Sequence, residues 1–203
     1  MRISQKLKTL NREIKLLGKT YLNFKQRIAG DYTIRQMSMA SSYTVFCHAE
    51  IETYLEDWAS FFVDIALAEW KNKRVTRPLV HLCTFHEGRG DLTGVPKTDV
   101  WSELVFQSIR RHKSTVAANN GIKEQNVCRL FAPVGFDVRD IDPILLADLT
   151  AFGSIRGDHA HKGRAEQFGA GFDPFDRKAK AERLLTLLEP LDNQLCAYAG
   201  VCT

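Results

Sequence analysis

The stretch TVFCHAEIETYLEDWASFFVDIALAEW, Thr44 to Trp70, decides the fold class. Its large apolar side chains recur at helical spacing and supply a broad apolar surface, formed by Phe46, Ile51, Tyr54, Leu55, Trp58, Phe61, Phe62 and Ile65. A helix with so much apolar surface lies deep in a domain. The stretch therefore predicts a long helix over about 33–73. We expect most of its acidic residues to face solvent, and an acid on its buried side would need a basic partner.

The first segment of the chain has a narrower apolar pattern. Its apolar residues follow alternating steps of four and three, at Ile3, Leu7, Leu10, Ile14, Leu17, Tyr21, Phe24 and Ile28. This is the spacing of a helix with one apolar seam, and Gly30 followed by Asp31 is a stop signal. The pattern predicts a basic amphipathic N-terminal helical arm over 1–30. Its seam needs a partner, either the body of the domain or another subunit.

The remaining residues, 31–203, are predicted to form one helical domain. Residues 74–97 contain glycine and proline signals and indicate an irregular excursion. Further helices are predicted over about 99–119 and 122–131, and two more begin at Asp142-Pro143 and Asp173-Pro174, where aspartate caps a helix and proline follows at its first position. No segment has the alternating pattern of a strand. We expect an all-α fold, an up-and-down bundle of four to five helices.

Bulk composition is that of an ordinary globular protein. The chain has 203 residues, of which 44% are hydrophobic and 26% charged, as in globular domains. No apolar run approaches the roughly 20 residues that cross a membrane, and the basic start lacks the apolar core of a signal peptide. We therefore expect a cytoplasmic protein with no membrane partner. The five scattered cysteines do not suggest a disulfide framework.

Positive charge is concentrated at the N-terminus. Residues 1–30 hold eight basic residues and one acid, a net charge of +7 in a chain whose total is +4, so the remainder carries −3. Such asymmetry suits a segment that touches nucleic acid or an acidic partner. A solvated helix face would show the same composition.

The stretch SIRGDHAHKG, Ser154 to Gly163, carries the residues best suited to chemistry. Arg156 presents a planar, permanently charged fork that fits phosphate oxygens. His161 is five residues later, and a histidine can pass protons in either direction near neutral pH. This pair suits attack of an RNA 2′-hydroxyl on its own phosphodiester, a reaction that moves a proton and develops charge on the phosphate. The alternative is a polar helix end, at which His161 and Lys162 favour the negative end of the helix dipole.

The spacing of this pair constrains the site. Five residues on a helix correspond to about 140° of rotation, so Arg156 and His161 do not share one face. Both can meet one phosphate only through the long arginine side chain, through a local break at Gly157, or through a second copy of the motif. A symmetric dimer would supply that copy.

A metal site is a further alternative. Asp158, His159 and His161 are ligand types, and the cluster His81, Cys83 and His86 is another such group. Neither spacing matches a zinc template such as paired CxxC or HExxH. We expect neither a metal nor a cofactor.

The motif Arg156-Gly157-Asp158-His159-Ala160-His161 resembles the R-x4-H motif of HEPN domains, an all-helical family of metal-independent endoribonucleases. The sequence from NGIKEQNVCRLF to the motif is similar to the RiboL-PSP-type branch, with its short helix, P-x-G turn and apolar helix. CHAEIETYLEDWA, 47–59, resembles the buried acidic helix of that branch and adds Glu52 as a supporting residue. The resemblance covers about 40–165. One departure is Gly157, where the family often has a polar residue.

The resemblance implies a homodimer whose two motifs line a shared cleft and cleave RNA, as a toxin or an antiviral defence effector, with an antitoxin or sensor protein as a possible partner. Arg156 would bind the phosphate and His161 would be the general acid and base. Asp158 and His159 would support them, and Lys162 and Arg164 would contact RNA. The alternative function is a non-catalytic HEPN-like module that binds RNA, nucleotide or a partner protein.

Overall fold

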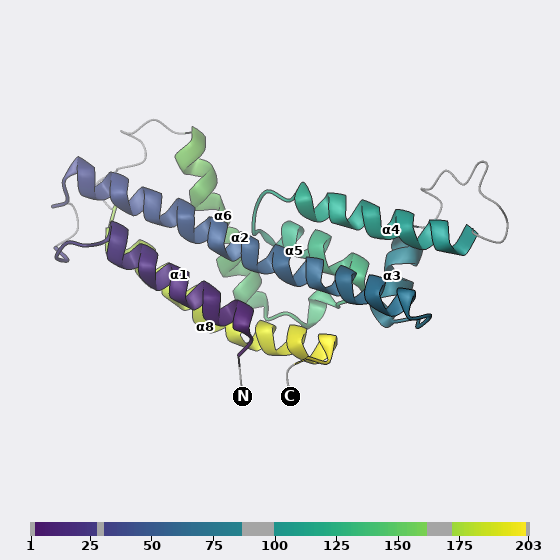
Figure 1. Ribbon diagram of the computed structural model, residues 1–203. Helices are drawn as coiled ribbons and strands as arrows, with labels where there is room; N and C mark the ends of the chain where they lie inside the picture. The colour runs from purple at the N-terminus through teal and green to yellow at the C-terminus, as the bar shows by residue number, and fades with distance from the viewer. Residues whose placement is uncertain (1–2, 28–30, 87–99, 162–171, 202–203) are drawn as a thin grey trace. The chain divides into compact units, whose positions relative to one another are not determined.

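The computed structural model describes residues 3–27, 31–86, 100–161 and 172–201, and of residues 157–161 it describes the backbone alone. Every regular element in these ranges is helical (Figure 1), which confirms the all-α class. The seven described α-helices exceed the four to five expected, because two of them, α3 and α5, are short. The helices are α1 (Gln5–Tyr21), α2 (Ile34–Lys71), α3 (Arg77–Phe85), α4 (Val100–Ala117), α5 (Glu124–Phe131), α6 (Pro143–His161) and α8 (Pro174–Ala199), with the 3-10 turns η1 (Ala132–Val134) and η2 (Val138–Asp140).

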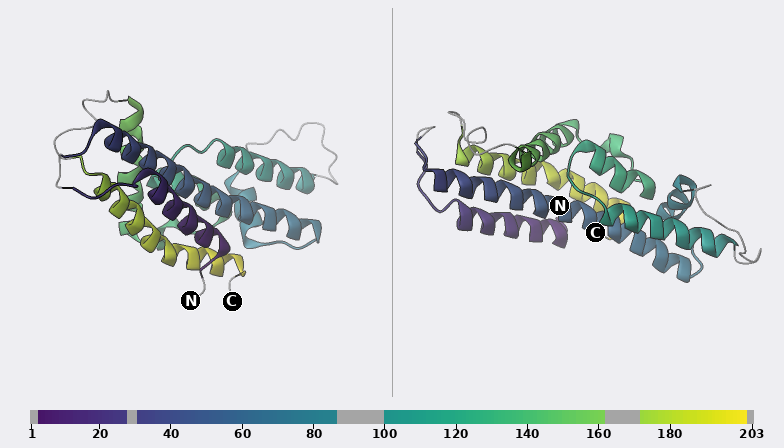
Figure 2. Two further views of the ribbon diagram at one scale, coloured as in Figure 1. Left: turned by 60° about the vertical axis from the view of Figure 1, so that its left-hand side comes forward. Right: turned by 90° about the horizontal axis from the view of Figure 1, so that it is seen from above.

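The long helix α2 confirms the prediction of a helix over 33–73. Figure 2 shows it as one unbroken helix from two directions. Its largest side chains are almost fully buried, including Tyr43, Ile51, Leu55, Trp58 and Phe62. The chain divides into two compact units: unit 1 comprises 1–54, 121–124 and 141–203, and unit 2 comprises 55–120 and 125–140. The helix α2 therefore contributes to both units.

Unit 1 contains α1, the first part of α2, α6 and α8. The apolar seam of α1 is buried, with Leu7, Leu10 and Ile14 no more than 2% exposed, and α1 packs against α8. The N-cap residue of α1, Ser4, also bonds to Asp192 of α8, through its backbone N–H at 2.7 Å and its hydroxyl at 2.6 Å. The body of the domain is thus the partner that the seam of α1 needs.

The expected end of the first helix is wrong. The pattern predicts a helix up to Gly30, whereas α1 ends at Tyr21. Beyond this point Phe24 still packs, but as a single ring: it lies edge-on to Tyr32 at 6.0 Å and to Phe175 at 5.8 Å. Apolar spacing alone cannot separate a helix from a segment whose aromatic side chains are buried one by one.

Unit 2 contains the second part of α2 together with α3, α4 and α5. An aromatic cluster forms its core: the ring of Phe62 lies 5.8 Å from that of Trp58 and 6.4 Å from that of Phe131. The helix α3 packs against α4 and the turn η1. These rings bury large apolar areas and prefer the offset and edge-on geometries seen here.

The prediction of an irregular segment over 74–97 is wrong in its first half. Residues Arg77–Phe85 form α3, and the rest of the expected excursion, 87–97, lies outside the described residues. Pro78 occupies the first turn of α3. Proline is tolerated there because the N–H groups of the first turn have no intrahelical acceptor. It therefore marks the start of a helix at this position.

The two predicted aspartate caps are confirmed. Asp142 accepts from the backbone N–H of Ile144 at 2.8 Å at the start of α6. Asp173 accepts from the backbone N–H of Phe175, also at 2.8 Å, at the start of α8. Each carboxylate satisfies a donor that the first helical turn leaves free, so a short sequence signal fixes where both helices begin.

The cysteines and the length and apolar character of the helices can be compared with the expectations from composition. Cys47, Cys83 and Cys128 form no disulfide, whereas Cys196 is disulfide-bonded, which the scattered cysteine spacing does not predict. Among the helices of the described ranges, none is both long and apolar enough to cross a membrane.

Gly135 closes the turn η1 in a conformation that other residues adopt only with strain. Its φ angle is +79°, and a Cβ atom at this position would overlap the imidazole ring of His81. We expect Gly135→Ala to lower the free energy of unfolding by about 3 kcal/mol, since the left-handed backbone and the steric overlap each cost about 1–2 kcal/mol. Denaturant unfolding measures the change.

Two variants separate the two costs. Gly200 also has a positive φ angle, +67°, but the space around it is open, so Gly200→Ala should cost only about 1 kcal/mol. Gly135→Ala should become milder when His81 is also replaced by alanine. Equal losses in Gly135→Ala and Gly200→Ala would show that the His81 contact contributes nothing.

Candidate functional site

The predicted R-x4-H motif lies in the last part of α6. The helix continues through Gly157 to His161, so the local break considered at Gly157 is not formed. Arg156 is half-buried. The side chains of Asp158, His159 and His161 lie outside the described residues, as do Lys162 and Arg164. The structure therefore places Arg156 in full and the rest of the motif only as helical backbone.

One face of α6 approaches the 121–124 segment of unit 1 closely. Gly153 is buried, and a Cβ atom there would lie 3.2 Å from Cγ of Lys123 and 3.8 Å from Nε2 of His48. One turn earlier, Thr150 Oγ1 accepts from the backbone N–H of Glu124 at 3.2 Å. A glycine at this position lets α6 sit next to His48 of α2. Arg156 follows Gly153 by three residues and so shares this face.

His48 and Glu52 lie one turn apart on α2 and form the buried side of the site. His48 is 2% exposed and Glu52 16%, and Nδ1 of His48 is 3.8 Å from a carboxylate oxygen of Glu52. The other Glu52 oxygen accepts a short hydrogen bond from the backbone N–H of Gly121. Glu52 is thus fixed by the segment that follows α4, and the carboxylate cannot turn freely toward solvent.

The positive charge of Arg156 affects the pKa of His48. Burial is the main cause that lowers the pKa of His48 to about 4, and the positive charge of Arg156 lowers it further. His48 is therefore neutral at pH 7, so its contact with Glu52 is not an ion pair at that pH. The arrangement holds a guanidinium beside a neutral imidazole and an anchored carboxylate on one side of α6.

The structure thus places two of the predicted residues, Arg156 and Glu52, near His48, a residue that sequence reasoning missed. His48 was not predicted, although its position four residues before Glu52 places both on one face of a helix. The expectation that the acids of α2 mostly face solvent holds for its two aspartates, at 57 and 64, whereas its four glutamates, at 50, 52, 56 and 69, are half-buried. Glu56 accepts from the Asn119 side chain at 2.9 Å.

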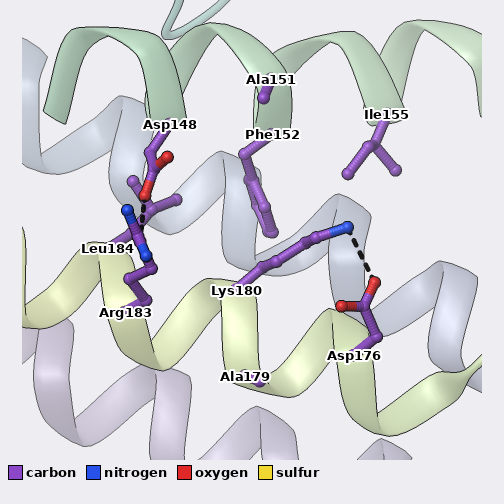
Figure 3. Close-up of a pocket in the computed structure, with 9 residues that line it drawn as sticks. All are labelled: Asp148, Ala151, Phe152, Ile155, Asp176, Ala179, Lys180, Arg183 and Leu184. Atoms are coloured by element: carbon purple, nitrogen blue, oxygen red, sulfur yellow. Dashed lines mark hydrogen bonds and ion pairs between the residues drawn. The ribbon is translucent and has the colours of Figure 1, made fainter. Parts of the chain in front are cut away.

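A separate pocket of about 430 Å³ lies between α6 and α8 (Figure 3). Its lining includes apolar Phe152, Ile155 and Leu184. Its cations are already paired, Lys180 with Asp176 at 2.7 Å and Arg183 with Asp148 at 2.5 Å. As far as the structure describes its walls, they include none of the predicted site residues.

No three histidine, cysteine or acidic side chains converge as metal ligands within the described part of the chain, which includes His81, Cys83 and His86. The second potential ligand group, Asp158, His159 and His161, has no described side chains.

Comparison with known proteins adds no relative. No protein-family model matches the chain, no curated protein matches its sequence, and no solved structure matches its fold. Function has to be argued from the site itself.

Proposed function

We propose that this protein is a metal-independent endoribonuclease of the HEPN type, in which Arg156 binds the scissile phosphate and His161 transfers the proton. The observation that supports the proposal best is the placement of Arg156. It is half-buried on the face of α6 that meets His48, and it is close enough to lower the pKa of His48. The planar, permanently charged fork of an arginine in this position favours binding of phosphate.

The division of roles follows from burial and charge. His48 is neutral at pH 7 and almost fully enclosed, so it acts as a positioning residue. Proton transfer falls to His161, which would take the proton from the 2′-hydroxyl as that oxygen attacks phosphorus. The bond from phosphorus to the 5′-oxygen then breaks, and His161 returns the proton to the leaving oxygen. Arg156 stabilises the charge that develops on the phosphate. The products are a 2′,3′-cyclic phosphate and a 5′-hydroxyl end.

The continuous helix favours a dimeric site. Because α6 runs unbroken through Gly157, positions 156 and 161 remain about 140° apart around the helix axis. Two routes to one phosphate are left, the reach of the arginine side chain and a second copy of the motif. We favour the second, a homodimer in which Arg156 and His161 of both copies line one cleft.

The experiment is cleavage of single-stranded RNA by the purified chain in excess EDTA. We expect Arg156→Ala and His161→Ala each to lower the rate by about 100-fold or more, because one positioned proton donor or anion-stabilising group contributes on that scale. Arg183→Ala is the matched control, since it removes an exposed arginine of the same unit that pairs with Asp148, and it should leave the rate unchanged. The products should carry cyclic phosphate ends.

Three outcomes would contradict the proposal. If His161→Ala cleaves RNA as fast as the unmodified chain, His161 does not transfer the proton and the proposal is wrong. Tight RNA binding without any cleavage would support the non-catalytic binding module, and loss of cleavage in EDTA would support a metal-dependent enzyme. For the proposed role as a toxin or defence effector, we expect expression to arrest growth and His161→Ala to reverse the arrest.

A further inference from the structure

The exposed side of α1 carries a row of cations that the proposed site does not use. We call Lys8, Arg12, Lys15 and Lys19 the cationic stripe. All four are exposed. At 100° per residue their directions fall within about 60° of one another, and they extend over about 16 Å of the helix. Four of the eight basic residues of the N-terminal segment are therefore aligned along one side of one helix.

The stripe borders a shallow groove of about 710 Å³. All four cations line this groove, together with Glu189 from α8. Among the ion pairs of the described residues, only one involves the stripe, between Arg12 and Glu13 at 2.7 Å. Lys8, Lys15 and Lys19 are thus available to bind an anion, and they do not serve to hold α1 in the fold.

We propose that the cationic stripe binds the sugar-phosphate backbone of RNA and so holds the substrate of the proposed nuclease. A line of exposed cations along a groove is the arrangement that tracks a phosphate backbone without reading its sequence. The inference rests on the proposed function for the choice of RNA. The presence of the cationic stripe does not depend on the R-x4-H motif.

Other polyanionic partners fit the surface less well. A helix that binds a membrane surface lays an apolar face into the lipid, but the apolar seam of α1 is buried against the domain. Leu16, 56% exposed, is the large apolar residue beside the stripe that remains accessible. A protein interface would bury a core of apolar and aromatic side chains, and the described lining of this groove contains no aromatic residue. The stripe is polar and linear, as a nucleic-acid backbone requires.

The test is binding of a fluorescent 20-nucleotide single strand of 2′-O-methyl RNA, which lacks the attacking hydroxyl and cannot be cleaved by the proposed reaction. The variant is Lys8→Gln, Lys15→Gln and Lys19→Gln together. We expect about a tenfold or greater loss of affinity, and a decrease of about 2 in the slope of log affinity against log salt, since each contact to a single strand contributes about 0.7. The three substitutions to arginine should retain binding.

The matched control replaces three exposed lysines elsewhere, Lys25, Lys71 and Lys73, with glutamine, which makes the same change in net charge. Because the proposed contacts are local, we expect this control to retain the affinity within about twofold. We expect its salt slope to change by no more than about 0.5. Equal losses in both triple variants would mean that overall charge, and not the stripe, drives binding, and would overturn the proposal. Binding of the unmodified chain to vesicles of phosphatidylcholine and phosphatidylserine, but not to the oligonucleotide, would also overturn it.

Failure of the two proposals can be distinguished. If the glutamine variant binds RNA as tightly as the unmodified chain while that chain cleaves RNA, the stripe proposal is wrong and the nuclease stands. If the variant loses binding and the unmodified chain never cleaves RNA, the stripe stands and the nuclease is wrong.

Discussion

Replacement of Asp192 by alanine is expected to lower the free energy of unfolding by about 3–5 kcal/mol. Asp192 is fully buried in α8. Its carboxyl oxygens accept from the backbone N–H of Ser4 at 2.7 Å, from the Ser4 hydroxyl at 2.6 Å and from the Tyr54 hydroxyl at 2.9 Å. Alanine removes this acceptor from three buried donors at once, and each such loss costs about 1–3 kcal/mol. Chemical denaturation at pH 7 measures the effect.

This residue has a large effect because it joins three helices of unit 1. Ser4 also caps α1, since its hydroxyl accepts from the backbone N–H of Leu7 at 3.0 Å. Tyr54 belongs to α2 and Asp192 to α8. One carboxyl group therefore orients the cap of α1 and the side chain of α2 relative to α8. We expect the N-terminal part of α1 to exchange its amide hydrogens faster in Asp192→Ala.

A double-mutant cycle tests the assignment. Tyr54→Phe alone should cost about 1 kcal/mol, the net value of one hydrogen bond. In the Asp192→Ala background it should cost almost nothing, because its acceptor is already gone. Asn193→Ala is the neighbouring control: its half-buried side chain donates to the Glu189 carbonyl of the same helix in an exposed hydrogen bond, so it should change stability by less than about 0.5 kcal/mol. A full cost of Tyr54→Phe in both backgrounds would contradict the network.

Sequence patterns predicted the elements whose signals are local. The proline and aspartate pairs at 142–143 and 173–174 fixed the starts of α6 and α8, because a cap and a first-turn proline act within a few residues. The apolar surface of 44–70 also predicted α2, because the helical spacing of apolar residues is a property of that segment alone. The end of α1 and the existence of α3 were missed, since the first depends on ring contacts of Phe24 with Phe175 across 151 residues of chain, and the second on reading Pro78 as a helix start.

The candidate site shows the same division. Arg156 and Glu52 were predicted from residue type and a resemblance, but the proximity of His48 to α6 depends on the small size of Gly153 and on the packing of the 121–124 segment. Asp192 was missed although it lies four residues after Leu188 and three before Leu195, on the buried side of α8. That spacing indicates a buried acid, but only the folded chain shows which donors, Ser4 and Tyr54, satisfy it.

Acidification is expected to destabilise the protein through two buried histidines. Burial lowers the pKa of His48 to about 4, with a smaller contribution from Arg156, and burial likewise lowers the pKa of His112 to about 4, with a smaller contribution from His86. In the unfolded chain both titrate near their ordinary value of about 6.5. Between pH 6.5 and pH 4 the unfolded state therefore takes up protons that the folded state refuses, so the free energy of unfolding falls as the pH falls.

The size of this effect follows from the two pKa values. A difference of one pKa unit corresponds to about 1.4 kcal/mol, so each histidine contributes a loss of roughly 3 kcal/mol by pH 4, with no further loss from these groups below that. Glu50 acts in the opposite direction, because burial and then the nearby charge of Glu13 raise its pKa. Urea unfolding at a series of pH values from 7.5 to 4 measures the sum.

Single variants separate the two histidines, which lie in different units of the chain. His48→Gln and His112→Gln keep a polar side chain of similar length but cannot be protonated in this range. Each variant is expected to lose stability at pH 7.5 and to show about half the decrease on acidification that the unmodified chain shows, because one of two equal contributions has been removed. A pH dependence that stays as steep in both variants would mean that other groups cause the acid sensitivity. If only His48→Gln flattens the curve, the enclosed environment of His112 does not keep its imidazole neutral.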